Sequence, residues 1–215
     1  MEITLDKIIP IPLKENLEKR PSEVWHSNIR FKTGEKVKIK APSGTGKTTL
    51  VHFLYGLRSD YTGTLNWDGK ALNHLKPDQK AGYRQKEISV VFQDLRLFSQ
   101  LTARENIELN RVLQEPYYPA TVIDEMAAAL QVDHILDQAA GICSYGEQQR
   151  IAIIRALVQP FSLLIMDEPF SHLDLNNTKK AAALIDRECD KRGAGFVLTD
   201  LDEDQFFNYT TYLTL

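Results

Sequence analysis

Apolar and polar residues alternate or cluster along the chain in short segments that predict strands. The segments are EKVKIKA (35–41), GTLNWDGK (63–70), EISVVFQ (87–93), SLLIMDEP (162–169), GFVLTD (195–200) and YTTYLTL (209–215). Apolar residues at helical spacing predict helices at 47–57, in two pieces between Thr102 and about Leu130, at 151–158 and at 176–193. The prolines of QEPYYPA (114–120) separate the two middle pieces, because proline interrupts a helix.

Strands that alternate with helices predict an α/β fold with a mostly parallel sheet. The segment that ends in Asp68-Gly69 is different, because that dipeptide is typical of a tight turn and predicts an antiparallel hairpin. At 215 residues, we expect one domain, with or without a small subdomain. We expect no secretory signal in the first ten residues and no segment apolar enough to cross a bilayer.

Charge and cysteine content narrow the class of protein further. The formal net charge of −3 argues against a general nucleic-acid-binding surface, which is usually basic. The two cysteines, Cys143 and Cys189, lack metal-type spacing and are expected to be reduced thiols of a cytosolic protein. For Cys143 a packing role is favoured over a redox role.

Candidate chemistry begins at APSGTGKT (41–48), between a predicted strand and a predicted helix. The segment matches the phosphate-loop pattern G-x-x-x-x-G-K-[ST], except that Ala41 replaces the first glycine. In such a loop main-chain N–H groups converge on phosphate oxygens, so we expect Lys47 to reach the β- and γ-phosphates and the Thr48 hydroxyl to bind Mg²⁺. Ala41 costs little unless its φ is positive, which would cost about 1–2 kcal/mol. The candidate nucleotide-binding residues are Ala41, Pro42, Ser43, Gly44, Thr45, Gly46, Lys47, Thr48 and Thr49.

Two adjacent carboxylates, Asp167 and Glu168, follow the apolar strand LLIM. In a phosphate-loop ATPase the first acid holds Mg²⁺ and the second polarises the attacking water. Successive side chains of a strand point to opposite faces, so both acids can face one site only if the backbone turns after Asp167, as Pro169 favours. A solvated acidic strand end is the alternative.

Five blocks occur in an order that resembles the ATP-binding subunit of ABC transporters over nearly the whole chain: APSGTGKTTL, VVFQD, SYGEQQR, LLIMDEP and SHLD. The resemblance implies a P-loop NTPase fold, with a RecA-like core at 1–92 and 147–215, a small antiparallel region, and an α-helical subdomain at 93–146. It assigns Gln93 to Mg²⁺ and to sensing the γ-phosphate. It assigns Ser144, Gly146 and Gln148 to the signature, which contacts ATP held by the opposite subunit. SHLD (171–174) matches the loop that joins the two sites.

The chain departs from this family at several positions. In the signature, Cys143 replaces Leu and Tyr145 replaces Gly, and the tyrosine can clash with the phosphate or stack and hydrogen-bond instead. Asp200 stands where the family has a histidine that donates to the γ-phosphate, and no histidine follows His172. The γ-phosphate would repel an ionised carboxylate there by roughly 4 kcal/mol at 4 Å with an effective dielectric constant of 20. The carboxylate avoids this repulsion if it turns away, takes a proton, or acts through Mg²⁺ or a water. Loss of one hydrogen-bond donor to the transition state lowers the rate by a factor of about 10²–10³.

One further departure concerns the base of the nucleotide. The family stacks adenine on an aromatic residue near IPIPLKEN (9–16), which contains none. Trp25 fits a core position better than this role.

The resemblance implies an ATPase that binds Mg·ATP, pairs with a second ABC ATPase subunit and drives transmembrane permease subunits from the inner face of the cell membrane. Glu168, Lys47 and Gln93 are the expected catalytic residues, and Thr48, Gln93 and Asp167 the expected Mg²⁺ ligands; turnover is expected to be slow. A nucleotide-holding clamp with little turnover and a non-transport ABC ATPase, as in cell division or envelope remodelling, are the alternatives. Neither the cargo nor its direction follows from the sequence.

Overall fold

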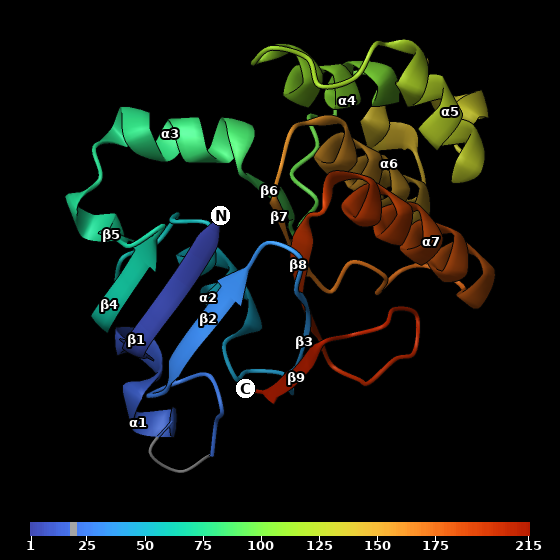
Figure 1. Cartoon of the computed structure of the whole chain (residues 1–215). Coiled ribbons are helices and arrows are strands. Elements are labelled where there is room, and N and C mark those ends of the chain that lie inside the picture. Colours follow the sequence, from blue (N-terminus) through green and yellow to red (C-terminus); the bar gives the residue numbers. More distant parts are fainter. Residues whose placement is uncertain (18–20) are drawn as a thin grey trace.

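The computed structural model describes residues 1–17 and 21–215 and contains a five-stranded parallel sheet. The strand order is β6-β7-β8-β3-β9, and every neighbouring pair is parallel (Figure 1). The strands are β3 (Lys36–Lys40), β6 (Ile88–Val91), β7 (Leu163–Asp167), β8 (Gly195–Asp200) and β9 (Thr211–Thr214). All five lie within segments predicted as strands, which confirms the α/β prediction.

A second, antiparallel sheet of four strands has the order β2-β1-β4-β5. Its strands are β1 (Glu2–Pro10), β2 (Asn28–Lys32), β4 (Tyr61–Trp67) and β5 (Lys70–Ala71). The turn between β4 and β5 confirms the predicted hairpin. The sequence analysis did not predict β1 and β2. In β1, a bulge at Lys7, where φ is 49°, breaks the alternation of buried residues.

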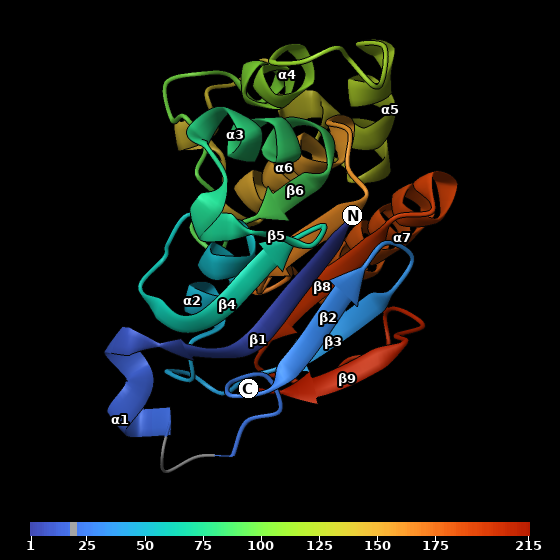
Figure 2. The same cartoon turned by 60° about the vertical axis from the view of Figure 1, so that its left-hand side comes forward.

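The two sheets enclose one helix, and other helices cover the outer face of the parallel sheet (Figures 1 and 2). Helix α2 (Lys47–Leu54) lies between the sheets and packs with side chains of both, such as Leu65 of β4 and Ile165 of β7. Helices α6 (Tyr145–Val158) and α7 (Leu175–Arg192) cover the opposite face. Helices α4 (Ala103–Val112) and α5 (Thr121–Ala129) pack on α6, away from the sheet. The remaining helices are α1 (Lys14–Leu17), α3 (Pro77–Lys86) and four short 3-10 turns, Ile11–Leu13, Leu72–His74, Asp133–Ile135 and Ala140–Ile142.

Trp25 belongs to the core between the two sheets, as the sequence analysis predicted. Its side chain is buried, and its ring packs edge-on against Phe53 at a centroid distance of 6.3 Å. The indole Nε1 donates to the carbonyl oxygen of Thr45 at 3.2 Å. Through this bond to Thr45, Trp25 therefore supports the main chain of the loop that precedes α2.

Helix starts differ slightly from the predicted positions. Helix α7 begins at Leu175, one residue before the predicted start, and Asp174 caps it by accepting from the N–H of Asn177 at 2.8 Å. Helix α6 begins at Tyr145, so the subdomain boundary expected between residues 146 and 147 lies within its first turn. That boundary stays a prediction.

Both cysteines are buried and free. Cys143 lies in the helical core cluster, in agreement with a packing role, and burial raises the pKa of the Cys189 thiol to about 12. No helix in the described part of the chain is long and apolar enough to span a membrane.

Candidate functional site

The loop from Ala41 to Gly46 joins β3 to α2 and has a backbone that requires glycine at two positions. Gly44 and Gly46 have φ values of 78° and 105°, in the left-handed region. A Cβ at residue 46 would also lie 2.8 Å from the Leu13 side chain. Ala41 is not among the residues with positive φ, so its replacement of the family's glycine is free of the backbone penalty.

Lys47, the first residue of α2, lies across this loop. Its Nζ donates to the carbonyl oxygen of Ala41 at 2.8 Å and forms an ion pair with Glu168 Oε1 at 3.1 Å. The side chain is buried, which strengthens both interactions relative to water. The only ammonium group in the pocket is therefore held between the loop and β7, within the described residues.

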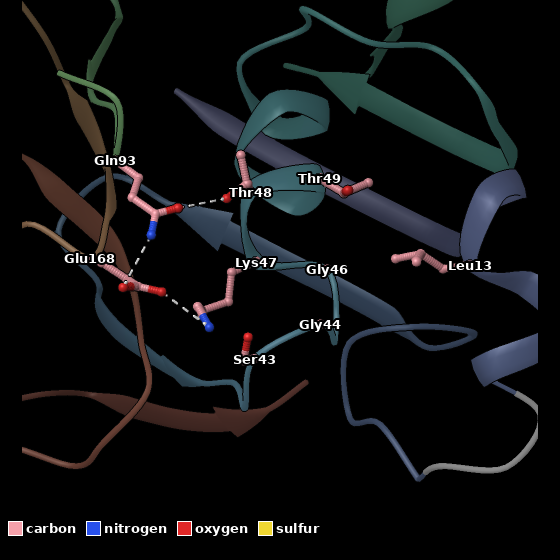
Figure 3. A pocket seen from close by; sticks show the side chains of 9 residues that line it. All are labelled: Leu13, Ser43, Gly44, Gly46, Lys47, Thr48, Thr49, Gln93 and Glu168. Atoms are coloured by element: carbon pink, nitrogen blue, oxygen red, sulfur yellow. Dashed lines mark hydrogen bonds and ion pairs between the residues drawn. The ribbon is translucent and has the colours of Figure 1, made fainter. Parts of the chain in front are cut away.

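A pocket of about 300 Å³ opens over the loop (Figure 3). It is lined by Leu13, Ser43, Gly44, Gly46, Lys47, Thr48, Thr49, Gln93 and Glu168. Eight of these nine residues were predicted from the sequence. Ala41, Pro42 and Thr45 belong to the same loop but do not line the pocket, since Ala41 is fully buried and Thr45 faces Trp25.

The backbone turns sharply after β7, as the paired carboxylates require. Glu168 has φ of 46°, an unusual value for a residue with a side chain, and its N–H donates to the carbonyl oxygen of Thr199 at 2.9 Å. This turn brings Glu168 to the pocket, while Asp167 stays buried beside it. Strain of this kind is typical of functional sites.

Gln93 connects the two sides of the pocket. Its Oε1 accepts from the Thr48 hydroxyl at 3.3 Å, and its Nε2 donates to Glu168 Oε2 at 3.3 Å (Figure 3). Together with the Lys47–Glu168 pair, these contacts form a chain from α2 across to β7. The sequence-predicted residues Lys47, Thr48, Gln93 and Glu168 thus lie in one site.

Asp167 carries one buried oxygen atom that nothing satisfies. Its Oδ1 accepts from the Thr199 hydroxyl at 2.8 Å, but Oδ2 has no hydrogen-bond partner among the described residues. Burial raises the pKa of Asp167, although the hydrogen bond from Thr199 and the positive charge of Lys47 oppose that shift. An unsatisfied carboxylate oxygen in such a position is well suited to a cation.

The start of α6 holds the residues predicted to form the signature, and these lie outside the pocket. Ser144 caps the helix and shares a capping box with Glu147, and Gln148 Nε2 donates to the carbonyl oxygen of Cys143 at 2.9 Å. A Cβ at Gly146 would lie 3.0 Å from the carbonyl oxygen of His172. The predicted residues Ser144, Gly146 and Gln148 are thus grouped together but apart from Lys47.

Asp200 is also outside the pocket. Its Oδ2 lies 3.3 Å from Lys38 Nζ, and its Oδ1 accepts from the N–H of Leu201 at 2.8 Å. Only its main chain touches the phosphate loop, since its carbonyl oxygen accepts from the N–H of Ala41 at 2.8 Å. Of the alternatives for this carboxylate, the geometry agrees with the one in which it turns away.

The sequence analysis missed three residues that shape the site. Leu13 lines the pocket, but an isolated leucine gives no signal in a sequence. Buried Gln149 donates to the carbonyl oxygen of Glu168 at 3.1 Å and accepts from the N–H of His172 at 3.0 Å. Arg155 donates to the carbonyl oxygens of Leu95 and Arg96 at 2.5 and 2.7 Å and so holds the loop after Gln93.

A family model described as ABC transporter matches residues 25–171. The chain belongs to the ABC transporter family. The cassette is 35% identical over 177 residues to YvcR of Bacillus subtilis, an uncharacterized ABC transporter ATP-binding protein, covering 81% of this chain and 68% of the relative. It is 32% identical over 179 residues to the lipoprotein-releasing system ATP-binding protein LolD of Francisella tularensis, covering 82% of this chain and 78% of the relative.

Solved structures agree with this assignment. The dimeric bacterial ABC transporter cassette MJ0796 has a TM-score of 0.78 to this chain at 25% identity, covering 93% of this chain and 88% of the other. A post-hydrolysis structure of MJ0796 bound to ADP and Pi has a TM-score of 0.75. The cassette is an ATP-binding subunit of an ABC transporter and an ATPase.

Proposed function

We propose that the cassette binds Mg·ATP in the pocket of Figure 3 and hydrolyses it slowly. The proposal rests on the environment of the Asp167 carboxylate. The buried Oδ2 of Asp167 lacks a protein partner among the described residues and lies beside the phosphate loop. A folded protein rarely leaves a buried carboxylate oxygen unpaired unless a ligand or ion satisfies it.

The residues present fit Mg²⁺. The carboxylate of Asp167, the hydroxyl of Thr48 and the amide oxygen of Gln93 are oxygen ligands, which Mg²⁺ prefers together with water and phosphate oxygens. When bound, the ion would supply positive charge beside the β- and γ-phosphates. We assign these three residues as its ligands, Asp167 through water.

The remaining pocket residues would have separate roles in binding and hydrolysing ATP. The main-chain N–H groups of residues 43–49 and the ammonium group of Lys47 would bind the phosphates, at the N-terminus of α2. Glu168 would orient and deprotonate the attacking water. Gln93 would transmit nucleotide binding at the site to the helical region at 93–146. Leu13 would contact the base in place of an aromatic residue.

We further propose that the cassette acts with a second ABC ATPase subunit and with transmembrane permease subunits at the inner face of the membrane. MJ0796 is dimeric, and LolD is named as part of a lipoprotein-releasing system. Ser144, Gly146 and Gln148 would contact ATP held by the second subunit. The altered residues Tyr145 and Asp200 would slow turnover and weaken pairing between identical copies.

A phosphate-release assay with purified protein tests the proposal. The wild type should hydrolyse Mg·ATP, and Glu168→Gln should lower the rate at least a hundredfold while still binding ATP. Lys47→Ala should lose ATP binding. Equal rates for the wild type and Glu168→Gln would instead favour a nucleotide-holding clamp.

A further inference from the structure

A fully buried lysine lies on β3, on the face of the parallel sheet opposite the nucleotide pocket. Val37 and Ile39 of β3 pack in the core with α2, so the alternating residues Lys36, Lys38 and Lys40 point to the other face. Lys36 confirms the direction, since its Nζ lies 2.6 Å from Asp186 of α7. Lys38 is wholly buried there, which an ammonium group tolerates only with close partners.

The partners of Lys38 are two carboxylates, Asp200 at the end of β8 and Asp204 in the segment that follows it. Its Nζ contacts Asp204 and lies 3.3 Å from Asp200 Oδ2. Asp204 has further donors, since Tyr209 donates to it at 2.7 Å and the N–H of Phe206 at 3.0 Å. Asp200 has only Lys38 and the N–H of Leu201 among the described residues. Of the two carboxylates, that of Asp200 therefore depends more on Lys38 for its position.

Strand β8 places Asp200 next to the pocket but facing away from it. Thr199, one residue earlier, points to the α2 face and donates to Asp167, so Asp200 points to the α7 face beside Lys38. A rotation at the end of the strand would bring the carboxylate of Asp200, which is 26% exposed, toward the pocket. Ala41 donates to the main-chain oxygen of Asp200, so this segment stays close to the phosphate loop in either case.

We propose that Lys38 is a positioning residue for ATP: by pairing with Asp200 inside the protein, it keeps that carboxylate away from the γ-phosphate. This inference rests on the proposed function and explains how the cassette can carry an acid at the position of the family's γ-phosphate-binding histidine. Lys38 touches neither nucleotide nor Mg²⁺ in this scheme. Its role is to neutralise and hold an anion that would otherwise repel the triphosphate.

Nucleotide affinities of matched variants, measured by calorimetry with magnesium, test this role. Lys38→Met should weaken ATP binding at least tenfold, about 1.4 kcal/mol, while ADP binding stays within threefold. The freed carboxylate acts on the γ-phosphate, which ADP lacks. Adding Asp200→Asn to Lys38→Met should restore ATP affinity to within threefold of the wild type. Lys40→Met is the matched control, because Lys40 is on the same strand and face but pairs with exposed Glu203.

Two outcomes would overturn the inference. One is a folded Lys38→Met that binds ATP as the wild type does, or that loses ATP and ADP affinity equally. The other is a single Asp200→Asn variant whose ATP affinity rises tenfold or more, which would mean that the carboxylate already faces the triphosphate. The single variant decides the question even if every Lys38→Met protein fails to fold, and an unchanged affinity supports the inference.

Lys47→Ala separates this inference from the proposed function. If neither the wild type nor Lys47→Ala binds Mg·ATP, the proposed function itself fails. If the wild type binds, Lys47→Ala does not, and Lys38→Met binds normally, only the role of Lys38 is refuted.

Discussion

The hydroxyl group of Tyr145 donates to the main-chain carbonyl oxygen of Gln93 at 3.2 Å, which joins the first residue of α6 to the residue that bridges the pocket. The tyrosine ring also packs against His172, with centroids 4.2 Å apart and the rings at 64°. Tyr145 therefore connects the start of α6 with Gln93 and with the loop after β7 within one subunit. Nearly half of the Tyr145 surface nevertheless stays exposed.

Removing the Tyr145 ring should strengthen pairing between identical copies. We expect Glu168→Gln to form only a weak dimer with Mg·ATP, and Tyr145→Gly in that background to tighten it about tenfold, roughly 1.4 kcal/mol, because the bulky ring leaves the signature surface. Tyr145→Phe, which keeps the ring, should not tighten it. Sizing chromatography with light scattering over a concentration series measures the dimer. A tight dimer of Glu168→Gln alone would contradict the expectation.

Gln149 should control the rate more than the affinity. It joins the main chain of Glu168 to that of His172, so Gln149→Ala would loosen the turn that orients Glu168 without touching the phosphate loop. We expect kcat to fall about 10- to 100-fold and the dissociation constant for ATP to stay within threefold, as for misplaced catalytic groups. Gln159→Ala is the control, because Gln159 is a buried glutamine at the other end of α6 and should leave kcat nearly unchanged.

An aromatic residue at position 13 should improve nucleotide binding. Leu13 lines the pocket near Gly46, and an aromatic ring there would stack on the base with about 0.5–1.5 kcal/mol beyond simple burial. Leu13→Tyr should therefore bind ATP and ADP about 2- to 10-fold more tightly, as fluorescent-nucleotide titration would show. Leu57→Tyr, at an exposed position outside the pocket, should have no effect. Unchanged affinity for Leu13→Tyr would exclude Leu13 from the base site.

Asp167 should destabilise the nucleotide-free protein at neutral pH. Burial raises its pKa above the ordinary value for an aspartate, so the folded state binds this proton more tightly than the unfolded state. Stability therefore falls as the pH rises from about 3.8 through the raised pKa, and the wild type is destabilised more at pH 7 than in acid. Asp167→Asn removes the buried charge and its destabilising effect. For a gain of about 1 kcal/mol in the free energy of unfolding, we expect Tm to rise by about 2–4 °C at pH 7.

Thermal melts over a range of pH check the sign of this effect. The advantage of Asp167→Asn should shrink toward acidic pH, where the wild-type carboxyl is protonated. Asp124→Asn is the control, because Arg104 lowers the pKa of that exposed carboxyl and its replacement should not raise Tm. A wild type more stable than Asp167→Asn at pH 7 without nucleotide would show that the buried charge is already compensated.

The sequence by itself determined the parts of this protein that depend on local spacing. The phosphate loop, the carboxylate pair and the signature are runs of adjacent residues, and their backbone requirements are local. Gly46 needs its left-handed φ wherever α2 packs, and Glu168 needs a turn because neighbouring side chains of a strand diverge. The central strands β6, β7 and β8 were equally readable, because residues buried on both faces of a sheet form nearly continuous apolar runs.

Only the tertiary structure decided which side chains face the pocket. Asp200 and Lys38 are 162 positions apart, and nothing in either segment indicates that they meet on the face opposite the nucleotide. Leu13 and Gln149 likewise acquire their places through contacts with distant segments, and β1 and β2 form through pairing that a bulge conceals in the sequence. The physical reason is that the face of a strand and the partner of a buried charge depend on how the sheets and helices pack together.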